Sequence, residues 1–273
     1  MKTLPSILLP GALAALAALA ALPVQAGAPR EAPAAPDAWG YTARTSPDPA
    51  CPFQYVDLAL GGTALTLVAA VDGVPAGDDG GGELALAAPF EFYGESASTL
   101  VASSNGYLAP GATLADEDGG HWRSDCPLPA IPDNGRARFA RILALAGDLA
   151  QGSSGQLLAE HFAQCPRPSA AGLAEPCTIV QWRNWTRLGQ SDSLDFQAVL
   201  YHVSWQVALQ YQALPALPGY TVGVQDGGAR SALAVACGAA PPVPAASAVC
   251  LFDPRFQPLG DPIFAHDFET GGD

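Results

Sequence analysis

Apolar and polar residues alternate in several short stretches that are separated by turn residues. In 205–214, WQVALQYQAL, the side chains of Val207, Leu209 and Tyr211 fall on one parity, and Ala208, Gln210 and Gln212 fall on the other. A period of two is typical of a strand with one buried face. The pattern therefore predicts strands rather than amphipathic helices.

The stretch 89–108, PFEFYGESASTLVASSNGYL, contains two strand pieces joined by tight corners. An aromatic cluster precedes Gly94, where we expect a turn. Asn105-Gly106 is a strong turn signal because both residue types tolerate positive φ. An apolar strand restarts at Tyr107, so this stretch predicts paired strands with aromatic residues in the core.

Similar apolar runs recur along the chain. We expect strands at 63–71, 155–163, 177–188, 195–203, 205–214, 220–226, 231–237 and 248–252. Ser204-Trp205 and Gly227-Gly228 mark two hairpins, whereas 138–149 fits either a short helix or a buried strand. The pattern predicts an all-β fold, an antiparallel β-sandwich of jelly-roll-like type with disulfides and long loops.

The composition agrees with many short strands and turns. The 273 residues are 49% apolar and only 14% charged, with 29 glycines and 26 prolines. We expect a Pro/Ala-rich linker at 27–38, a β-sandwich domain at 39–252 and an acidic tail at 253–273. Within that tail, Ile263, Phe264 and Phe268 are too few to form a core.

Residues 1–26 have the features of a secretory signal peptide. Lys2 gives a positive start, 8–22 is rich in Ala and Leu, and small residues at Val24 and Ala26 precede a cleavage position. The apolar run is shorter than the roughly 18–20 residues of a spanning helix, which disfavours a membrane anchor. We expect a bacterial protein that is secreted to the periplasm, the extracellular space or the cell surface, without a transmembrane segment after cleavage.

Charge excludes several classes of partner and chemistry. Lys2 is the only lysine, and cleavage of the predicted signal peptide removes it. The formal net charge of the mature chain is therefore one unit more negative than −14. An acidic chain of this kind does not bind nucleic acid through a basic surface and is repelled by anionic lipid. The mature chain also cannot form a lysine Schiff base or a Walker-type phosphate loop.

An even number of cysteines in a secreted chain predicts disulfides. The six are Cys51, Cys126, Cys165, Cys177, Cys237 and Cys250. Their pairing is open on sequence alone, but nearness along the chain suggests Cys165–Cys177 and Cys237–Cys250, which leaves Cys51–Cys126. We expect no free thiol, and no CxxC spacing is present for a zinc site.

The sequence contains no recognisable catalytic or cofactor motif. The four histidines, His121, His161, His202 and His266, form no HExxH pattern. Asp192 and Asp195 are explained by solvation in a loop and at a strand start. The acidic segments 72–83 and 115–121 suggest calcium, but Val74 and Ala76 occupy ligand positions of the EF-hand spacing. We therefore assign no catalytic, cofactor-binding or metal-binding residues.

Trp182 and Trp185 are the candidate binding residues. They fall on opposite parities of the strand 177–188, so one buried face cannot take both unless the sheet is covered on two sides. One indole on an accessible surface would be typical of β modules that bind sugars or proteins. Burial of both in the core is the alternative.

The order of motifs resembles a module of bacterial secreted and surface proteins, and more distantly the nidogen-type extracellular domain. The motifs are Pro89 to Gly94, Ser103 to Leu108, Cys126, Asp148-Leu149, Gln181 to Asn184, Phe196 to Tyr201, Gln210-Tyr211, Thr221 to Gln225, and Cys237 with Cys250. The resemblance implies a β-sandwich-like accessory domain and carries over no functional residue. One departure is Leu145-Ala146-Gly147 before Asp148, where the family usually has an aromatic residue and a second acid.

These observations favour a secreted or surface-exposed non-catalytic β-sandwich module, adhesive or ligand-binding. The alternative is a secreted hydrolase with an unrecognised active site, since triads assemble from distant positions. The acidic surface makes a protein or a neutral glycan the expected partner.

Overall fold

The computed structural model describes residues 35–130, 139–170, 172, 174–215, 219–238 and 243–258. The predicted signal peptide 1–26 and the tail residues Ile263, Phe264 and Phe268 lie outside this part. The described residues form fourteen strands and no helix. No helix in this part is long and apolar enough to cross a membrane.

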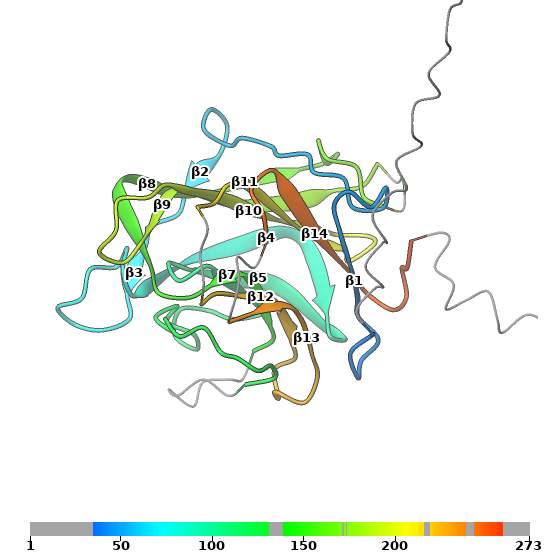
Figure 1. The fold of residues 1–273 in the computed structure, drawn as a ribbon, viewed down its shortest axis with the longest axis horizontal. Helices are drawn as coiled ribbons and strands as arrows, with labels where there is room; N and C mark the ends of the chain where they lie inside the picture. The colour runs from blue at the N-terminus through cyan, green and yellow to red at the C-terminus, as the bar shows by residue number, and fades with distance from the viewer. Residues whose placement is uncertain are drawn as a thin grey trace, which may run out of the picture. The chain divides into compact units, whose positions relative to one another are not determined.

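The strands form two antiparallel sheets that face each other (Figure 1). Sheet A has the order β1 (Thr42–Thr45), β14 (Ser247–Phe252), β11 (Val207–Ala213), β10 (Leu194–Tyr201), β9 (Cys177–Arg187), β8 (Leu149–Phe162) and β2 (Thr63–Ala64). Sheet B has the order β13 (Ala232–Cys237), β12 (Thr221–Gln225), β7 (Arg141–Ala146), β6 (Tyr107–Pro110), β5 (Glu95–Ser103), β4 (Gly80–Phe92) and β3 (Val68–Ala69). This arrangement confirms the predicted all-β antiparallel sandwich.

The main core lies between the sheets. It contains Phe92, Leu100 and Ile142 from sheet B together with Val180 and Leu209 from sheet A. Burying large apolar side chains of this kind stabilises the fold by about 1.5–3 kcal/mol per side chain. A second cluster, around Cys51 and Cys250, lies among the side chains on the outer face of sheet A.

Two predicted turns form as the residue types require. Tyr93 and Gly94 have φ values of 49° and 78° and connect β4 to β5, the backbone signs of a two-residue hairpin turn. Gly106, with φ 77°, connects β5 to β6, and a Cβ there would lie 2.3 Å from the Leu145 carbonyl oxygen. Glycine is therefore required at 106 by both conformation and space.

The structure corrects the predicted strand 63–71 and decides between helix and strand for the segment 138–149. The apolar run 63–71 is not one strand, because β2 pairs with β8 in sheet A and β3 pairs with β4 in sheet B. The chain crosses between the sheets at Leu65 and Leu67, which pack against the core and so give the run its apolar character. The ambiguous segment 138–149 contains β7, a strand whose six residues are all buried.

All six cysteines are paired, as predicted, but two of the three expected pairings are wrong. Cys165 bonds Cys177, whereas Cys51 bonds Cys250 and Cys126 bonds Cys237. Cys237 and Cys250 are near in sequence, yet the chain passes from β13 in sheet B to β14 in sheet A between them. Disulfides need Cα atoms within about 7 Å, so sheet membership overrides sequence distance.

Candidate functional site

Trp182 and Trp185, the predicted surface residues, are both fully buried in the core. In the pairing of β9 with β10, Trp185 opposes Leu194 and Trp182 opposes Phe196, so β9 carries one extra residue. This bulge, where Asn184 adopts φ 51°, turns both indoles to the same face. The proposed surface site is therefore wrong, because the parity argument assumed a regular strand.

The two indoles donate hydrogen bonds to the segment Ser103-Ser104-Asn105-Gly106, the SSNG motif, which connects β5 to β6. Trp182 Nε1 donates to the Ser103 carbonyl oxygen and Trp185 Nε1 to the Ser104 carbonyl oxygen, each at 2.8 Å. Asn105 accepts from the Leu149 amide at 3.0 Å and donates to Asp79 at 2.9 Å. The motif thus joins sheet A to sheet B, which gives it a structural role.

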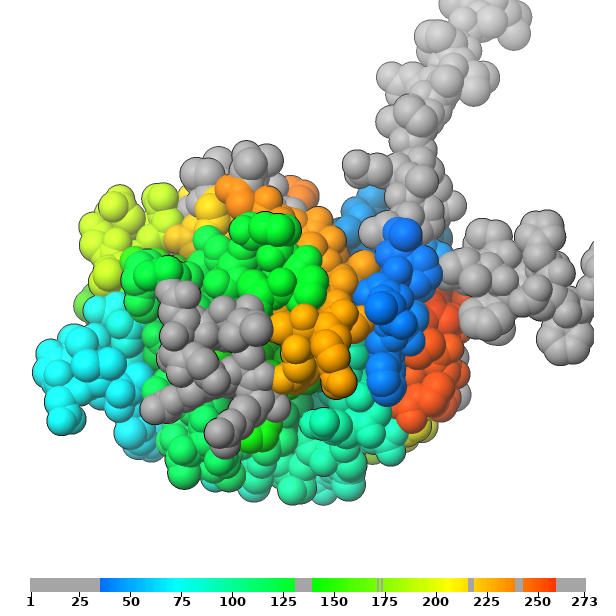
Figure 2. Space-filling model, turned by 90° about the horizontal axis from the view of Figure 1, so that it is seen from below, coloured from blue at the N-terminus to red at the C-terminus, as the bar shows by residue number. Residues whose placement is uncertain are grey.

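An open groove of about 390 Å³ lies elsewhere, where three distant segments meet. Its lining comes from the start of the described chain, the β4–β5 turn and the β12–β13 turn, and includes Trp39, Tyr93, Glu95, Asp226 and Arg230. Figure 2 shows the start of the described residues (blue) beside the β12–β13 region (orange). We call this set of residues the Trp39 groove.

Trp39 is held as a fixed aromatic surface in this groove. Asp37 Oδ1 accepts the backbone N–H groups of Trp39, Gly40 and Tyr41 at 3.0, 2.8 and 2.8 Å. The Trp39 amide also donates to Ser231 Oγ at 3.0 Å. A Cβ on Gly94 would lie 2.9 Å from the indole ring, so the ring rests against the turn. With 46% of its surface exposed, Trp39 is ordered and still accessible.

Polar groups surround the indole. Tyr93 packs edge-on against Trp39 at 6.0 Å and donates its hydroxyl to Asp37 Oδ2 at 2.7 Å. Burial and the hydrogen bond to Asp37 raise the pKa of Tyr93 well above its usual value, so it remains a donor. Arg230 is mostly exposed and pairs with Asp226 at 3.3 Å, and the Glu95 side chain is exposed.

The groove was missed by the sequence analysis because its parts are distant in sequence. Trp39 begins the predicted domain as the first aromatic residue after the linker, but nothing local indicates its neighbours. The linker prediction 27–38 also extends too far, because Asp37 is part of the folded site. The local signal in the sequence is Asp37 two residues before Trp39, because aspartate side chains often accept the N–H groups of the residues that follow.

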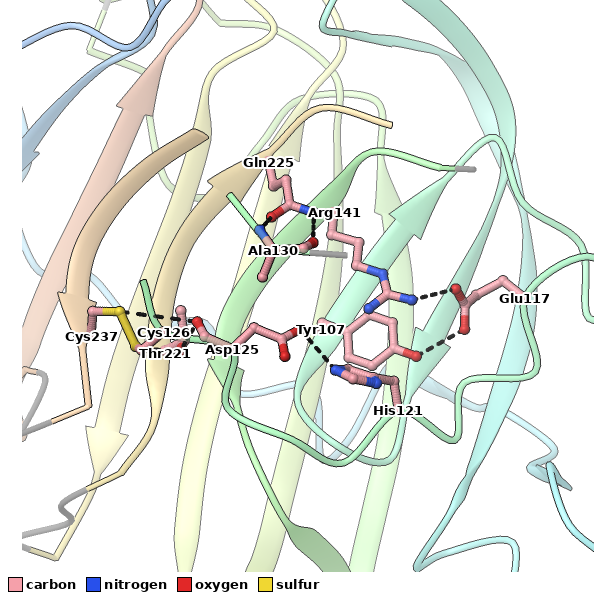
Figure 3. Close-up of polar contacts among 10 residues, drawn as sticks. All are labelled: Tyr107, Glu117, His121, Asp125, Cys126, Ala130, Arg141, Thr221, Gln225 and Cys237. Carbon is pink, nitrogen blue, oxygen red and sulfur yellow. Dashed lines mark hydrogen bonds and ion pairs between the residues drawn. A yellow bond between two sulfur atoms is a disulfide. The ribbon is translucent and has the colours of Figure 1, made fainter. Parts of the chain in front are cut away.

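A buried polar cluster lies beneath the loop 111–130, on the outer face of sheet B (Figure 3). Tyr107 donates its hydroxyl to Glu117 at 2.9 Å, and Arg141 pairs with Glu117 at 2.7 Å. The Arg141 guanidinium also lies 4.7 Å from the centre of the Tyr107 ring. All three side chains are at least 97% buried among the described residues, which indicates a structural role. We define these three residues as the Arg141 cluster.

The candidate acid and histidine residues are distributed rather than brought together. His121 pairs with Asp125 at 2.8 Å, while His202 and His161 lie near Thr178 on another part of the fold. His266 lies outside the described residues. Within the described part, no group of three or more His, Cys, Asp or Glu side chains is placed to hold a metal ion.

The carboxylates considered for paired-carboxylate chemistry or for calcium binding make structural contacts. Asp192 pairs with Arg187 at 2.6 Å, and Asp195 accepts the Asn184 amide at 2.8 Å in the β9 bulge. In the acidic segment 72–83, Glu83 lies in β4 and accepts the Leu114 amide at 2.8 Å. The pKa of Asp78 is raised by burial and by the neighbouring Asp79.

His202 makes stability depend on pH. Its Nδ1 donates to the Pro89 carbonyl oxygen at 3.1 Å, and its Nε2 accepts from Thr178 at 2.8 Å. Burial lowers the pKa of His202 and outweighs the hydrogen bond to the Pro89 carbonyl oxygen, which raises it. Repulsion from His161 lowers the pKa further, and Glu175 opposes this more weakly. The unfolded chain therefore takes up a proton first as pH falls below about 6.5, and stability that is present above that pH is lost.

We predict that His202→Asn, which keeps a donor near Pro89, reduces the fall in unfolding free energy between pH 7 and 5. The reduction is at most about 1.4 kcal/mol per pH unit, the value for one proton. Urea denaturation at several pH values measures it. An unchanged slope in the variant would show that other groups set the pH dependence.

Comparison with protein-family models, with curated proteins and with solved structures gives no match. The class shown by the structure is a disulfide-bonded, two-sheet antiparallel β protein. Three disulfides are compatible with an oxidising compartment.

Proposed function

We propose that the protein is a secreted or surface-exposed non-catalytic module that binds a neutral glycan through the Trp39 groove. The observation that carries this proposal is the exposed but fixed Trp39 indole inside a groove of about 390 Å³. This volume is in the range of small-ligand sites, about 300–1,000 Å³, whereas protein partners use broader surfaces.

The groups around the indole suit a sugar. The apolar face of a sugar ring packs on an aromatic side chain, while its hydroxyls need donors and acceptors at the rim. Glu95 supplies exposed carboxylate oxygens and Arg230 supplies exposed N–H donors, whereas the buried Asp226 carboxylate accepts from Arg230 and Ser231 and holds the turn. The acidic character of the mature chain disfavours anionic glycans.

We predict that Trp39→Ala weakens glycan binding at least about ten-fold, equivalent to about 1.4 kcal/mol, without lowering the melting temperature much. An array of neutral and anionic glycans, followed by calorimetry on the neutral glycans bound, measures the effect. Trp122→Ala is the matched control, because Trp122 is also 46% exposed and does not line the groove.

Equal losses in both tryptophan variants, or no glycan binding at all, would contradict this function. Binding of a protein partner that depends on Trp39 would keep the site and change the ligand class. Incubating the bound glycans with the protein and analysing the products tests the hydrolase alternative.

A further inference from the structure

The three disulfides differ sharply in exposure. Cys51 and Cys250 are fully buried, and Cys165 and Cys177 are at most 9% exposed. Cys126 and Cys237, by contrast, are both exposed residues. Thiol–disulfide exchange requires a thiolate to reach a sulfur atom. Solvent exposure therefore makes Cys126–Cys237 more accessible to an attacking thiolate than the other two disulfides.

The exposed disulfide lies at an edge of the fold. Cys237 ends β13, which has only β12 as a neighbour in the described part of sheet B. Cys126 belongs to the loop 111–130 that covers the Arg141 cluster (Figure 3). The disulfide therefore joins the covering loop to the edge strand of the sheet beneath it.

Other contacts hold the same loop without the disulfide. Thr221 Oγ1 donates to the Asp125 carbonyl oxygen at 3.1 Å. Gln225 accepts from the Ala130 amide at 2.7 Å and donates to the Ala130 carbonyl oxygen at 2.8 Å. Both side chains come from β12, so opening the disulfide leaves the loop attached to the sheet and does not require unfolding.

We propose that Cys126–Cys237 is a thiol–disulfide exchange site that an external dithiol reduces in the folded protein. A thiolate of the dithiol attacks one sulfur, the Cys126–Cys237 bond breaks, and a mixed disulfide forms while the other cysteine leaves as a thiolate and takes up a proton. The second thiol of the reductant resolves the mixed disulfide. Two electrons pass to the protein, and the reductant becomes a disulfide.

Reduction changes the attachment of the covering loop. Once the covalent link to β13 is lost, the segment 121–130 is held to sheet B by hydrogen bonds from Thr221 and Gln225 and by packing of Leu128. Local opening then costs less, because no covalent bond restricts it. Arg123, an exposed residue of this segment, becomes a better trypsin site in the reduced form.

The experiment treats the folded mature protein with dithiothreitol, alkylates at timed intervals and maps the labelled peptides. We expect Cys126 and Cys237 to be labelled at least about ten-fold faster than the other four cysteines, since their access needs no global unfolding. Far-UV circular dichroism, recorded in parallel, should remain unchanged, and trypsin cleavage at Arg123 should accelerate.

A Cys126→Ser/Cys237→Ser variant should lose the fast labelling, while a Cys165→Ser/Cys177→Ser variant should keep it. If either variant fails to fold, the labelling order in the unmodified protein still decides. Labelling of all six cysteines together with loss of the β signal, or labelling of a buried pair first, would overturn the proposal.

Discussion

Trp182→Ala should lower the free energy of unfolding by about 3–5 kcal/mol, the range for removing a large aromatic side chain from a packed core. Trp182 is fully buried and stacks on Phe196 with ring centres 4.8 Å apart. The substitution also leaves the Ser103 carbonyl oxygen without its indole donor. A loss of this size approaches the total stability of many domains, about 5–15 kcal/mol.

Trp182→Phe separates the contribution of aromatic packing from that of the indole hydrogen bond to Ser103. Phenylalanine keeps an aromatic ring beside Phe196 but cannot donate to Ser103, so we expect a smaller loss of about 1–3 kcal/mol. Trp122→Ala is the control, because an exposed tryptophan should change stability by only about 0.5 kcal/mol. Urea denaturation followed by circular dichroism measures all three. A loss for Trp182→Ala no larger than for Trp122→Ala would contradict the buried position.

Local turn chemistry made part of this fold predictable. Hairpins were expected at Ser204-Trp205 and Gly227-Gly228, and the structure has β10 paired with β11 and β12 paired with β13. In each case the signal and the structure lie within one short segment. Features that depend on neighbouring residues can be inferred from sequence because no long-range information is needed.

Features set by strand irregularity were not predictable in the same way. The orientation of Trp185 follows from one extra residue in β9, and an extra residue shifts every later side chain to the other face. Asn184 with φ 51° marks the bulge in the structure, but asparagine is common in turns and loops as well. The correct face therefore required the pairing of β9 with β10.

Features assembled from distant segments were also hidden. The Trp39 groove combines Trp39 with Glu95, the first residue of β5, and with Arg230 of the β12–β13 turn. The cysteine pairings depend on which sheet each strand joins. Sequence patterning indicates that a residue is buried or exposed, but it does not indicate which distant residue it meets.

Glu117→Gln should lower the free energy of unfolding by about 3–5 kcal/mol, because it removes the negative charge that neutralises the buried Arg141 guanidinium. The pair is 2.7 Å apart, with side chains 3% and 0% exposed. Glu91→Gln is the exposed control, since Glu91 and Arg255 are also 2.7 Å apart but are 35% and 43% exposed, and Arg255 keeps its ion pair with Asp253 at 2.8 Å. For that exposed pair we expect at most about 1 kcal/mol.

The triple variant Tyr107→Phe/Glu117→Leu/Arg141→Met removes the phenol hydroxyl, the carboxylate and the guanidinium of the Arg141 cluster together. No charge or hydroxyl of the cluster is then left unpartnered, and only the Gly119 amide, which donates to Glu117 at 3.2 Å, loses its acceptor. The variant should therefore regain most of the stability lost in Glu117→Gln. Urea denaturation of the four proteins at one pH and salt concentration provides the comparison. If Glu117→Gln loses no more stability than Glu91→Gln, solvent reaches the cluster and the loop 111–130 does not seal it.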